Sequence, residues 1–160
     1  MKRRVIVFLV SCSLIMAACG DGKVYQEYTD FDDRYWLASD TVKFYFTLDD
    51  TVSRYNLYCN IRNSTKYPFS RIFVNFSLAD SSGGVYHKAL LNDFLFDPKS
   101  GEPLGKTGLG DLYDHQVPVL RNYAFKGSGP FVIRMGQLMR TDTLEGVLSI
   151  GLGIEKVTQP

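Results

Sequence analysis

The stretch RYNLYCNIRN, residues 54–63, alternates apolar and polar side chains with a period of two. Alternation over about four to eight residues is typical of a β-strand that has one face in a core and the other toward solvent. This stretch therefore predicts a half-buried strand. Its apolar side holds Tyr55, Leu57, Cys59 and Ile61, and its polar side holds Asn56, Tyr58, Asn60 and Arg62.

The same period recurs on both sides of this stretch. Aromatic and β-branched residues enrich the runs, and turn-forming residues separate them at spacings of roughly ten residues. The pattern predicts an all-β fold, a single-domain antiparallel β-sandwich of the jelly-roll or C2-like kind. VYHKALLNDFLFD (85–97) fits either strands or a short helix, and we favour strands. The clearest runs are VKFYFTLDD (42–50), RIFVNFSLAD (71–80), FVIRM (131–135) and VLSIGLGI (147–154).

The last of these runs carries two glycines on one side. Gly151 and Gly153 alternate with the apolar residues Ile150, Leu152 and Ile154. Glycine inside a strand often marks a bulge or a place where another segment comes close to the backbone. We expect one of these two features on the polar side of this strand.

The first twenty residues, MKRRVIVFLVSCSLIMAACG, have the order of a secretory signal. Three basic residues precede an apolar run over residues 5–16, and two small alanines precede Cys19. The apolar run is short for a membrane span, and the small residues mark a cleavage site. Small residues directly before a cysteine resemble the lipobox of bacterial lipoproteins, which predicts acyl chains on Cys19. The alternative is an ordinary signal peptide with an incidental cysteine.

These features divide the chain into three parts. Residues 1–18 form the expected lipoprotein signal peptide, and residues 42–160 form the sandwich domain. Residues 19–41 hold the lipidated cysteine, a short tether and an aromatic segment. We expect that aromatic segment to dock on the domain with Trp36 as its anchor.

Charge and cysteine usage narrow the function. The chain has 18 basic and 17 acidic residues, and loss of the three basic residues at positions 2–4 leaves a mature chain of about −2, without a basic surplus for nucleic acid. Of the three cysteines, Cys12 leaves with the signal and Cys19 takes lipid, so Cys59 has no disulfide partner. Its place on the apolar side of a strand predicts a packing role.

The loop SGEPLGKTGLGD, residues 100–111, contains Gly-Lys-Thr without the spacing of a phosphate-binding loop. Further glycines follow where a helix would have to begin, so we expect a long surface connection. The two histidines, His87 and His115, lack metal-ligand spacing, and no nucleophile motif is present. The sequence therefore predicts no enzyme, no metal site and no cofactor.

Several stretches together resemble the gliding-motility lipoprotein family GldH of the Bacteroidota. They are the lipobox Cys19 with the aromatic segment around Trp36, YNLYCNIRNSTKYPFSRIFV (55–74), GEPLGKTGLGD (101–111) and GPFVIRMGQLMRTDTLEGVLSIGLGIEK (129–156). The resemblance implies a lipid-anchored envelope protein needed for gliding and no catalytic activity. It also implies protein partners in the envelope machinery that serves this motility and type IX secretion.

Three sites of the form Asp-Thr-aliphatic resemble the O-glycosylation signal of exported Bacteroidota proteins. Their threonines are Thr41, Thr51 and Thr143. Asp-Thr is also common at strand edges and turns. Both readings stay open from the sequence.

Our first hypothesis is a non-enzymatic lipoprotein, anchored in the outer membrane through Cys19, that works by contact at its periplasmic face. The expected contact residues form two clusters, Arg62, Asn63, Tyr67 and Arg71 in one, and Arg134, Gln137 and Arg140 in the other. The alternative is a glycan- or ligand-binding envelope module, in which Tyr45, Tyr58 and Phe73 on outer strand faces stack on the ligand. An exposed row of these aromatics would favour the alternative.

Overall fold

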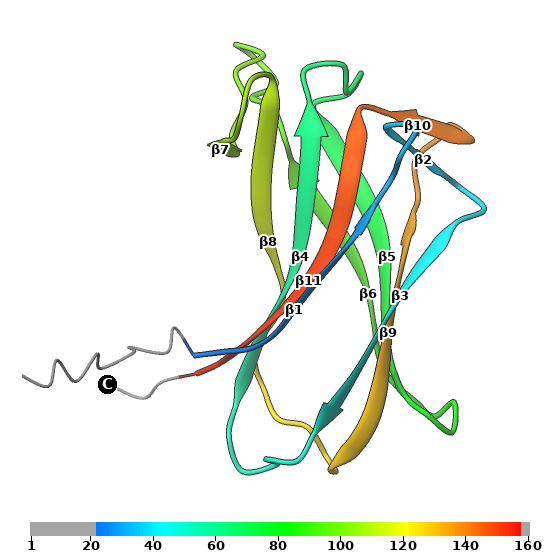
Figure 1. Ribbon diagram of the computed structural model, residues 1–160, viewed down its shortest axis with the longest axis vertical. Coiled ribbons are helices and arrows are strands. Elements are labelled where there is room, and N and C mark those ends of the chain that lie inside the picture. The colour runs from blue at the N-terminus through cyan, green and yellow to red at the C-terminus, as the bar shows by residue number, and fades with distance from the viewer. Residues whose placement is uncertain (1–21, 158–160) are drawn as a thin grey trace, which may run out of the picture.

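The computed structural model describes residues 22–157, so the signal peptide and Cys19 lie outside the described residues. The described chain folds into strands without any helix (Figure 1). No segment within it is a helix capable of crossing a bilayer. The strands are β1 (Lys23–Asp30), β2 (Tyr35–Leu37), β3 (Thr41–Leu48), β4 (Tyr55–Ser64), β5 (Arg71–Asp80), β6 (Val85–Phe94), β7 (Lys106–Thr107), β8 (Leu112–Tyr123), β9 (Gly129–Gln137), β10 (Thr143–Glu145) and β11 (Val147–Lys156).

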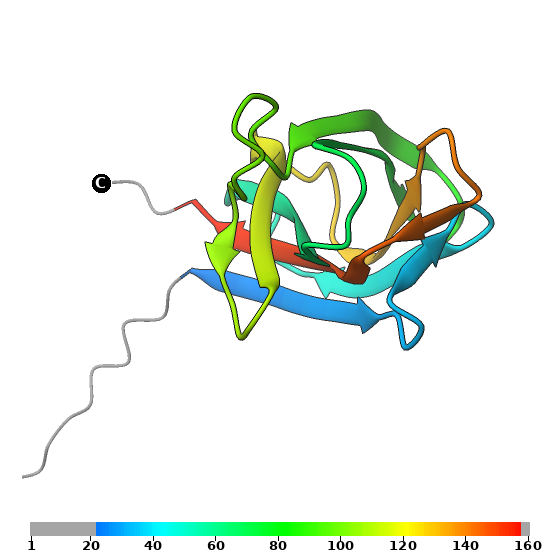
Figure 2. The same ribbon diagram turned by 90° about the horizontal axis from the view of Figure 1, so that it is seen from above.

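Two antiparallel sheets enclose the core (Figures 1 and 2). The first sheet has the strand order β1-β11-β4-β8-β7, and the second sheet has the order β3-β9-β5-β6. A short ribbon of β10 and β2 lies at one end of the sandwich. This arrangement confirms the all-β antiparallel sandwich predicted from the alternating runs.

Most connections carry the chain from one sheet to the other. Only β5–β6 and β7–β8 are consecutive strands that also pair with each other. The remaining pairs join strands far apart in sequence, such as β1 with β11 and β3 with β9. Local alternation can therefore predict the strands, whereas the pairing depends on how the whole core closes.

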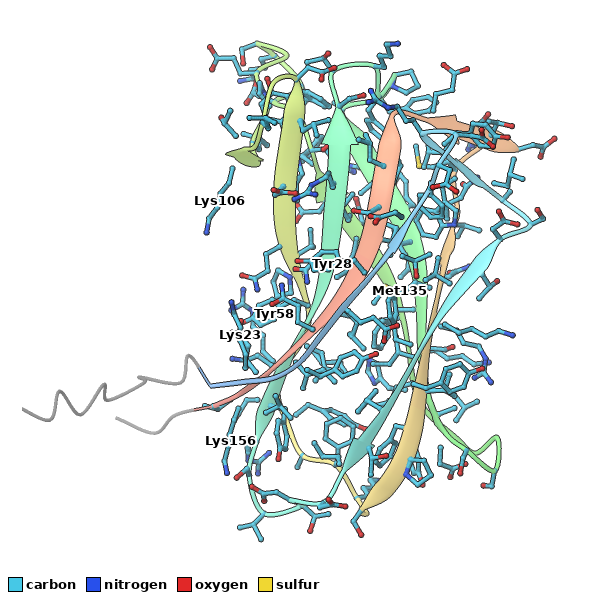
Figure 3. The ribbon with its side chains drawn as sticks, in the orientation of Figure 1. Lys23, Tyr28, Tyr58, Lys106, Met135 and Lys156 are labelled. Carbon is cyan, nitrogen blue, oxygen red and sulfur yellow. The ribbon has the colours of Figure 1, made fainter. Side chains whose placement is uncertain are left out.

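The core lies where the alternation placed it. In β3 the residues are alternately exposed and buried along the whole strand. Phe44, Leu57 and Met135 have no exposed surface, and Figure 3 shows the side chains that fill the space between the sheets. Cys59 is also buried, and burial raises the pKa of its thiol to about 12. The thiol is thus a protonated packing group, as its position in the strand predicted.

The aromatic segment after the expected tether is part of the sandwich. Strand β1 pairs with β11 along its length and forms one edge of the first sheet. Trp36 is completely buried, and its indole nitrogen donates to the Asp40 carbonyl at 2.9 Å. The Trp36 ring stacks on Phe31 with a centroid separation of 5.7 Å. These contacts fix the segment between β1 and β3 against the core.

Candidate contact surfaces

The outer face of the second sheet carries a row of cations. Lys43 of β3 lies directly opposite Arg134 of β9, and Arg134 lies opposite Ser77 of β5. Ser77 in turn lies opposite Lys88 of β6. Residues that oppose one another in a pleated sheet point to the same face, so these side chains form one row across all four strands.

Arg71 belongs to the same face. It lies opposite Phe94 of β6, and its guanidinium carbon sits 4.0 Å from the centroid of the Phe94 ring. This contact is a cation–π interaction, which orients the arginine without neutralising its charge. We call the four cations Lys43, Arg71, Lys88 and Arg134 together the cationic face.

No carboxylate neutralises the cationic face. The other outward residues of its four strands are neutral by the register of the sheet. Both ion pairs of residues 22–157 lie elsewhere, Arg62 with Asp114 and Lys156 with Asp50. Like charges directly opposite each other destabilise a sheet. The fold therefore keeps an electrostatically unfavourable row of like charges on this face.

An apolar-edged groove of about 670 Å³ borders this row. Arg134 and Lys88 line it together with Leu90 and Leu138, which are each about half exposed. Gln137 shapes the loop that carries Leu138, because its amide nitrogen donates to the Thr141 carbonyl at 2.9 Å. The Gln137 amide oxygen accepts from the Met139 backbone nitrogen at 2.7 Å. The groove thus combines cations with two exposed leucines, and the buried Gln137 amide holds the loop that carries Leu138.

The structure corrects the placement of three expected contact residues. Asn63, Tyr67 and Gln137 are buried. Tyr67 donates its hydroxyl to the Arg71 carbonyl at 2.9 Å, and the Asn63 amide donates to the Ser64 carbonyl at 3.1 Å. Side chains that are at most 5% exposed offer little surface to a partner, and these three form hydrogen bonds to nearby backbone instead.

The remaining expected residues are distributed over different surfaces. Arg71 and Arg134 came from separate sequence clusters, and the pairing of β5 with β9 places both on the cationic face. Arg62 lies on the outer face of the first sheet, and Arg140 is exposed in the loop between β9 and β10. Lys43 and Lys88 were missed, because only the long-range strand pairing aligns them with Arg134.

The three aromatics of the alternative hypothesis do not form a row. Tyr45 is 66% exposed on the second sheet, whereas Phe73 on that sheet is only partly exposed. Tyr58 belongs to β4 of the first sheet, so it points away from the other two. A sugar cannot stack on all three at once.

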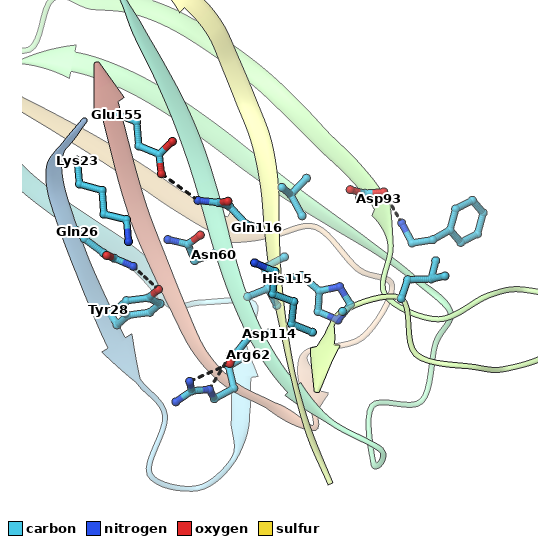
Figure 4. Close-up of a pocket in the computed structure, with 16 residues that line it drawn as sticks. Lys23, Gln26, Tyr28, Asn60, Arg62, Asp93, Asp114, His115, Gln116 and Glu155 are labelled. Atoms are coloured by element: carbon cyan, nitrogen blue, oxygen red, sulfur yellow. Dashed lines mark hydrogen bonds and ion pairs between the residues drawn. The ribbon is translucent and has the colours of Figure 1, made fainter. Parts of the chain in front are cut away.

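A second groove, of about 620 Å³, lies on the outer face of the first sheet (Figure 4). Tyr28 and Gln26 of β1 line one side, and Asn60 of β4 and Gln116 of β8 line the other. Strand β11 runs between them, with Gly151 and Gly153 turned to the groove. We call this feature the β11 groove.

One end of the β11 groove carries an ion pair. Arg62 donates to both Asp114 oxygens, at 2.7 Å and 3.1 Å, and these bonds raise the pKa of the arginine. Both side chains are nearly half exposed, so the pair contributes only up to about 1 kcal/mol to stability. The two charges neutralise each other, so the pair adds no net charge to this end of the groove.

Two buried polar atoms that line this pocket have no hydrogen-bond partner within the described chain. They are the amide nitrogen of Asn60 and Nε2 of His115. His115 points to the other side of β8 and packs against the backbone of Gly105, where a Cβ atom would lie 2.6 Å from Nε2. Burial lowers the pKa of His115, although nearby Asp93 and Asp114 oppose this shift.

The described residues contain no set of three or more His, Cys, Asp or Glu side chains that could hold a metal ion. Within the glycine-rich loop, Lys106 and Thr107 form β7 and pair with β8. Thr41, Thr51 and Thr143, the threonines of the Asp-Thr-aliphatic sites, are all exposed.

Comparison with known proteins finds a family model and two relatives that carry the same family name. The family model described as GldH lipoprotein matches residues 23–154. The chain is 29% identical to a gliding motility lipoprotein GldH homolog of Christiangramia forsetii, over 98% of each chain. It is 24% identical to gliding motility lipoprotein GldH of Flavobacterium johnsoniae, over 92% of this chain and 94% of the relative.

Among solved structures, the VP2 subviral particle of infectious bursal disease virus aligns with a TM-score of 0.38 and 10% identity. The alignment covers 82% of this chain and 33% of the viral chain, and it carries no functional inference.

Proposed function

From the premise that this chain belongs to the GldH lipoprotein family, we propose that it is a lipid-anchored cell-envelope protein of the gliding-motility apparatus. It sits at the periplasmic face of the outer membrane and works by contacting other envelope proteins rather than by catalysis. The family name and the names of the relatives support the lipoprotein and motility parts of this proposal. The position where the chain enters the sandwich supports close anchoring at the membrane. The cationic face supports contact with other proteins.

The observation that carries the proposal is how soon after Cys19 the chain becomes fixed. The Gly22 carbonyl accepts a hydrogen bond from the Lys156 backbone nitrogen at 2.7 Å, so the sandwich holds the chain from Gly22 onward. Three residue steps separate Cys19 from Gly22, and such a stretch spans at most about 11 Å. An acylated Cys19 would therefore hold this end of the domain against the bilayer.

The short distance to the anchor gives the domain a preferred orientation. Lys23 and Lys156 project near the entry point of the chain into the first sheet (Figure 3). The cationic face belongs to the second sheet, whose outer side points away from the first sheet. In this orientation the cationic face is available to a protein partner in the periplasm, and that partner presents an acidic surface.

Charge complementarity suits such an interaction. Unpaired cations attract an acidic surface over about one Debye length, which is about 8 Å at physiological ionic strength. The exposed leucines in the adjoining groove add apolar contact area once the partner has docked. The partner belongs to the envelope machinery of gliding and type IX secretion.

Crosslinking in living cells tests the contact role. We expect the double substitution Lys43→Glu, Arg134→Glu to remove the wild-type crosslinked species, while Lys126→Glu preserves it because Lys126 lies in the exposed β8–β9 loop. The crosslinked species are detected by immunoblotting for this protein. The comparison requires equal levels of the wild type and the variants in the cells. An unchanged crosslinking pattern in the double variant would show that the cationic face is not the contact surface.

A further inference from the structure

The β11 groove has a different chemistry from the cationic face. We propose that it binds a neutral N-acetylated sugar chain, with Asn60, Gln116 and Gln26 as hydrogen-bonding groups and Tyr28 as a stacking platform. This inference does not depend on the lipid anchor or on the cationic face. The proposed glycan contacts lie on the first sheet and do not need a row of exposed aromatics.

The floor of the groove is bare backbone. A Cβ atom at Gly151 would lie 2.5 Å from Cδ1 of Tyr28, and one at Gly153 would lie 3.2 Å from the amide nitrogen of Asn60. Side chains at these positions would therefore occupy the space between β1 and β4. Glycine in a strand commonly marks such a close approach, of a ligand or of another segment. At Gly151 the approaching group is the Tyr28 ring, and at Gly153 it is the Asn60 side chain, so both glycines let groove-lining side chains lie close to the β11 backbone.

Tyr28 offers a flat apolar surface beside this floor. One edge of its ring rests against Gly151, and 47% of the residue is exposed. The Gln26 amide nitrogen donates to the Tyr28 hydroxyl at 2.7 Å, which holds the ring in place. A ring fixed in this way can pack against the apolar face of a pyranose, and its ordering needs little further loss of conformational freedom on binding.

The opposite side of the groove supplies amides. Asn60 is only 6% exposed, and its amide nitrogen has no hydrogen-bond partner within residues 22–157. Buried polar atoms are nearly always hydrogen-bonded, so an orphaned donor at the edge of a groove indicates a missing acceptor. Gln116 is exposed beside it and makes only a long contact of 3.4 Å to Glu155. An acetamido carbonyl or a sugar hydroxyl would supply the acceptor that Asn60 lacks.

The charges around the groove favour a neutral ligand. The lining carries three cations (Lys23, Arg62 and Lys106) and three carboxylates (Asp93, Asp114 and Glu155), so its formal charge is zero, and Arg62 is paired directly with Asp114. Amide side chains both donate and accept, which matches hydroxyl and acetamido groups that also do both. The volume of about 620 Å³ falls within the range of small-ligand pockets, which is about 300–1,000 Å³.

Calorimetric titration of the full-length lipoprotein in detergent micelles tests the proposal. The probe is tetra-N-acetylchitotetraose, and the matched control sugar is cellotetraose, which carries hydroxyls in place of the acetamido groups. We expect the acetylated sugar to bind at least ten-fold more tightly than the control. Tyr28→Ala and Gln116→Ala should each weaken binding at least five-fold, whereas Tyr45→Ala on the other sheet should leave it unchanged.

A glycine substitution gives an independent check. Gly153→Ala would displace the Asn60 amide, which lies 3.2 Å from the added Cβ atom, and should weaken binding at least five-fold, while Gly127→Ala, with open space around it, should not affect binding. Near-UV circular dichroism confirms that each variant keeps its fold. No binding of the acetylated sugar at millimolar concentration, or full binding by Tyr28→Ala and Gln116→Ala, would overturn the proposal. Equal binding of acetyl-tetraalanine amide would also overturn it, in favour of an extended peptide. None of these results bears on anchoring by Cys19.

Discussion

Lys43 and Arg134 lie directly opposite each other in β3 and β9, on a sheet face whose other outward residues include no carboxylate. Two cations in register cost stability, since like charges opposite each other in a sheet repel. A surface that keeps such a pair is less stable than one with a neutral or oppositely charged pair, so we infer that the pair has a role other than stability. Under the proposed function that role is attraction for an acidic partner, so substitutions at this pair can separate an effect on stability from an effect on partner binding.

We predict that Lys43→Glu stabilises the protein and weakens its function. The substitution replaces a repulsive cross-strand pair with an attractive one, which should raise the free energy of unfolding by up to about 1 kcal/mol. Chemical denaturation followed by circular dichroism measures this change. Lys126→Glu is the control for charge alone, and an equal gain there would remove the cross-strand explanation.

We predict that Gly146→Ala is strongly destabilising. Gly146 has a positive φ of 76°, and an added Cβ atom would lie 2.3 Å from the Tyr67 backbone nitrogen. Both the backbone conformation and the close contact oppose a side chain, so we expect a loss of more than about 1 kcal/mol. Gly127→Ala has open space around it and should change the denaturation midpoint little. Similar midpoints for the two variants would contradict the packing described for this turn.

Stability should fall as the pH drops from 7 to 5.5, and His115 should cause part of the fall. Burial lowers the pKa of this histidine, so the unfolded chain takes up its proton at a higher pH than the folded chain does. The contribution is fully present above the unfolded pKa of about 6.5 and is lost as the pH falls toward the folded pKa. The variant His115→Leu should therefore show a shallower pH dependence of the unfolding free energy. A slope in His115→Leu equal to that of the wild type would contradict this assignment.

We propose O-glycosylation at Thr41, Thr51 and Thr143, whose exposed side chains leave room for a sugar. Protein purified from the native envelope should then carry mass increments of hexose size. Substitution of Thr41, Thr51 or Thr143 by alanine should remove the mass of one attached glycan. Thr107→Ala, at an exposed threonine outside this motif, should leave the mass of the attached glycans unchanged. An intact mass that matches the acylated polypeptide alone would exclude the modification.

Sequence reasoning could predict the strands because period-two alternation is local. In RYNLYCNIRN the apolar positions Leu57, Cys59 and Ile61 are all buried. The same period also places Asn63 on the buried side, a signal that its polar side chain obscured. Gly151 was correctly expected to allow close approach, since Tyr28 rests against it.

The surfaces were harder to predict because they depend on strand pairing. Arg71, Lys88 and Arg134 are distant in sequence and share a face only through the pairings of β5 with β6 and β9. The β11 groove likewise needs β1, from the start of the described chain, beside β11 at its end. Tyr67 and Gln137 lie near turns, where alternation does not report which side chains fold inward.

The mass of the N-terminal peptide of the mature protein tests the central claim most directly. Protein extracted from native membranes should begin at Cys19 and carry the mass of two or three acyl chains, and Cys59→Ala should keep the same modified peptide. Cys19→Ala should lack the acyl mass, and peptide mass identifies it even if the signal peptide is retained. A wild-type mature chain with an unacylated first residue, recovered free of the membrane, would contradict the account.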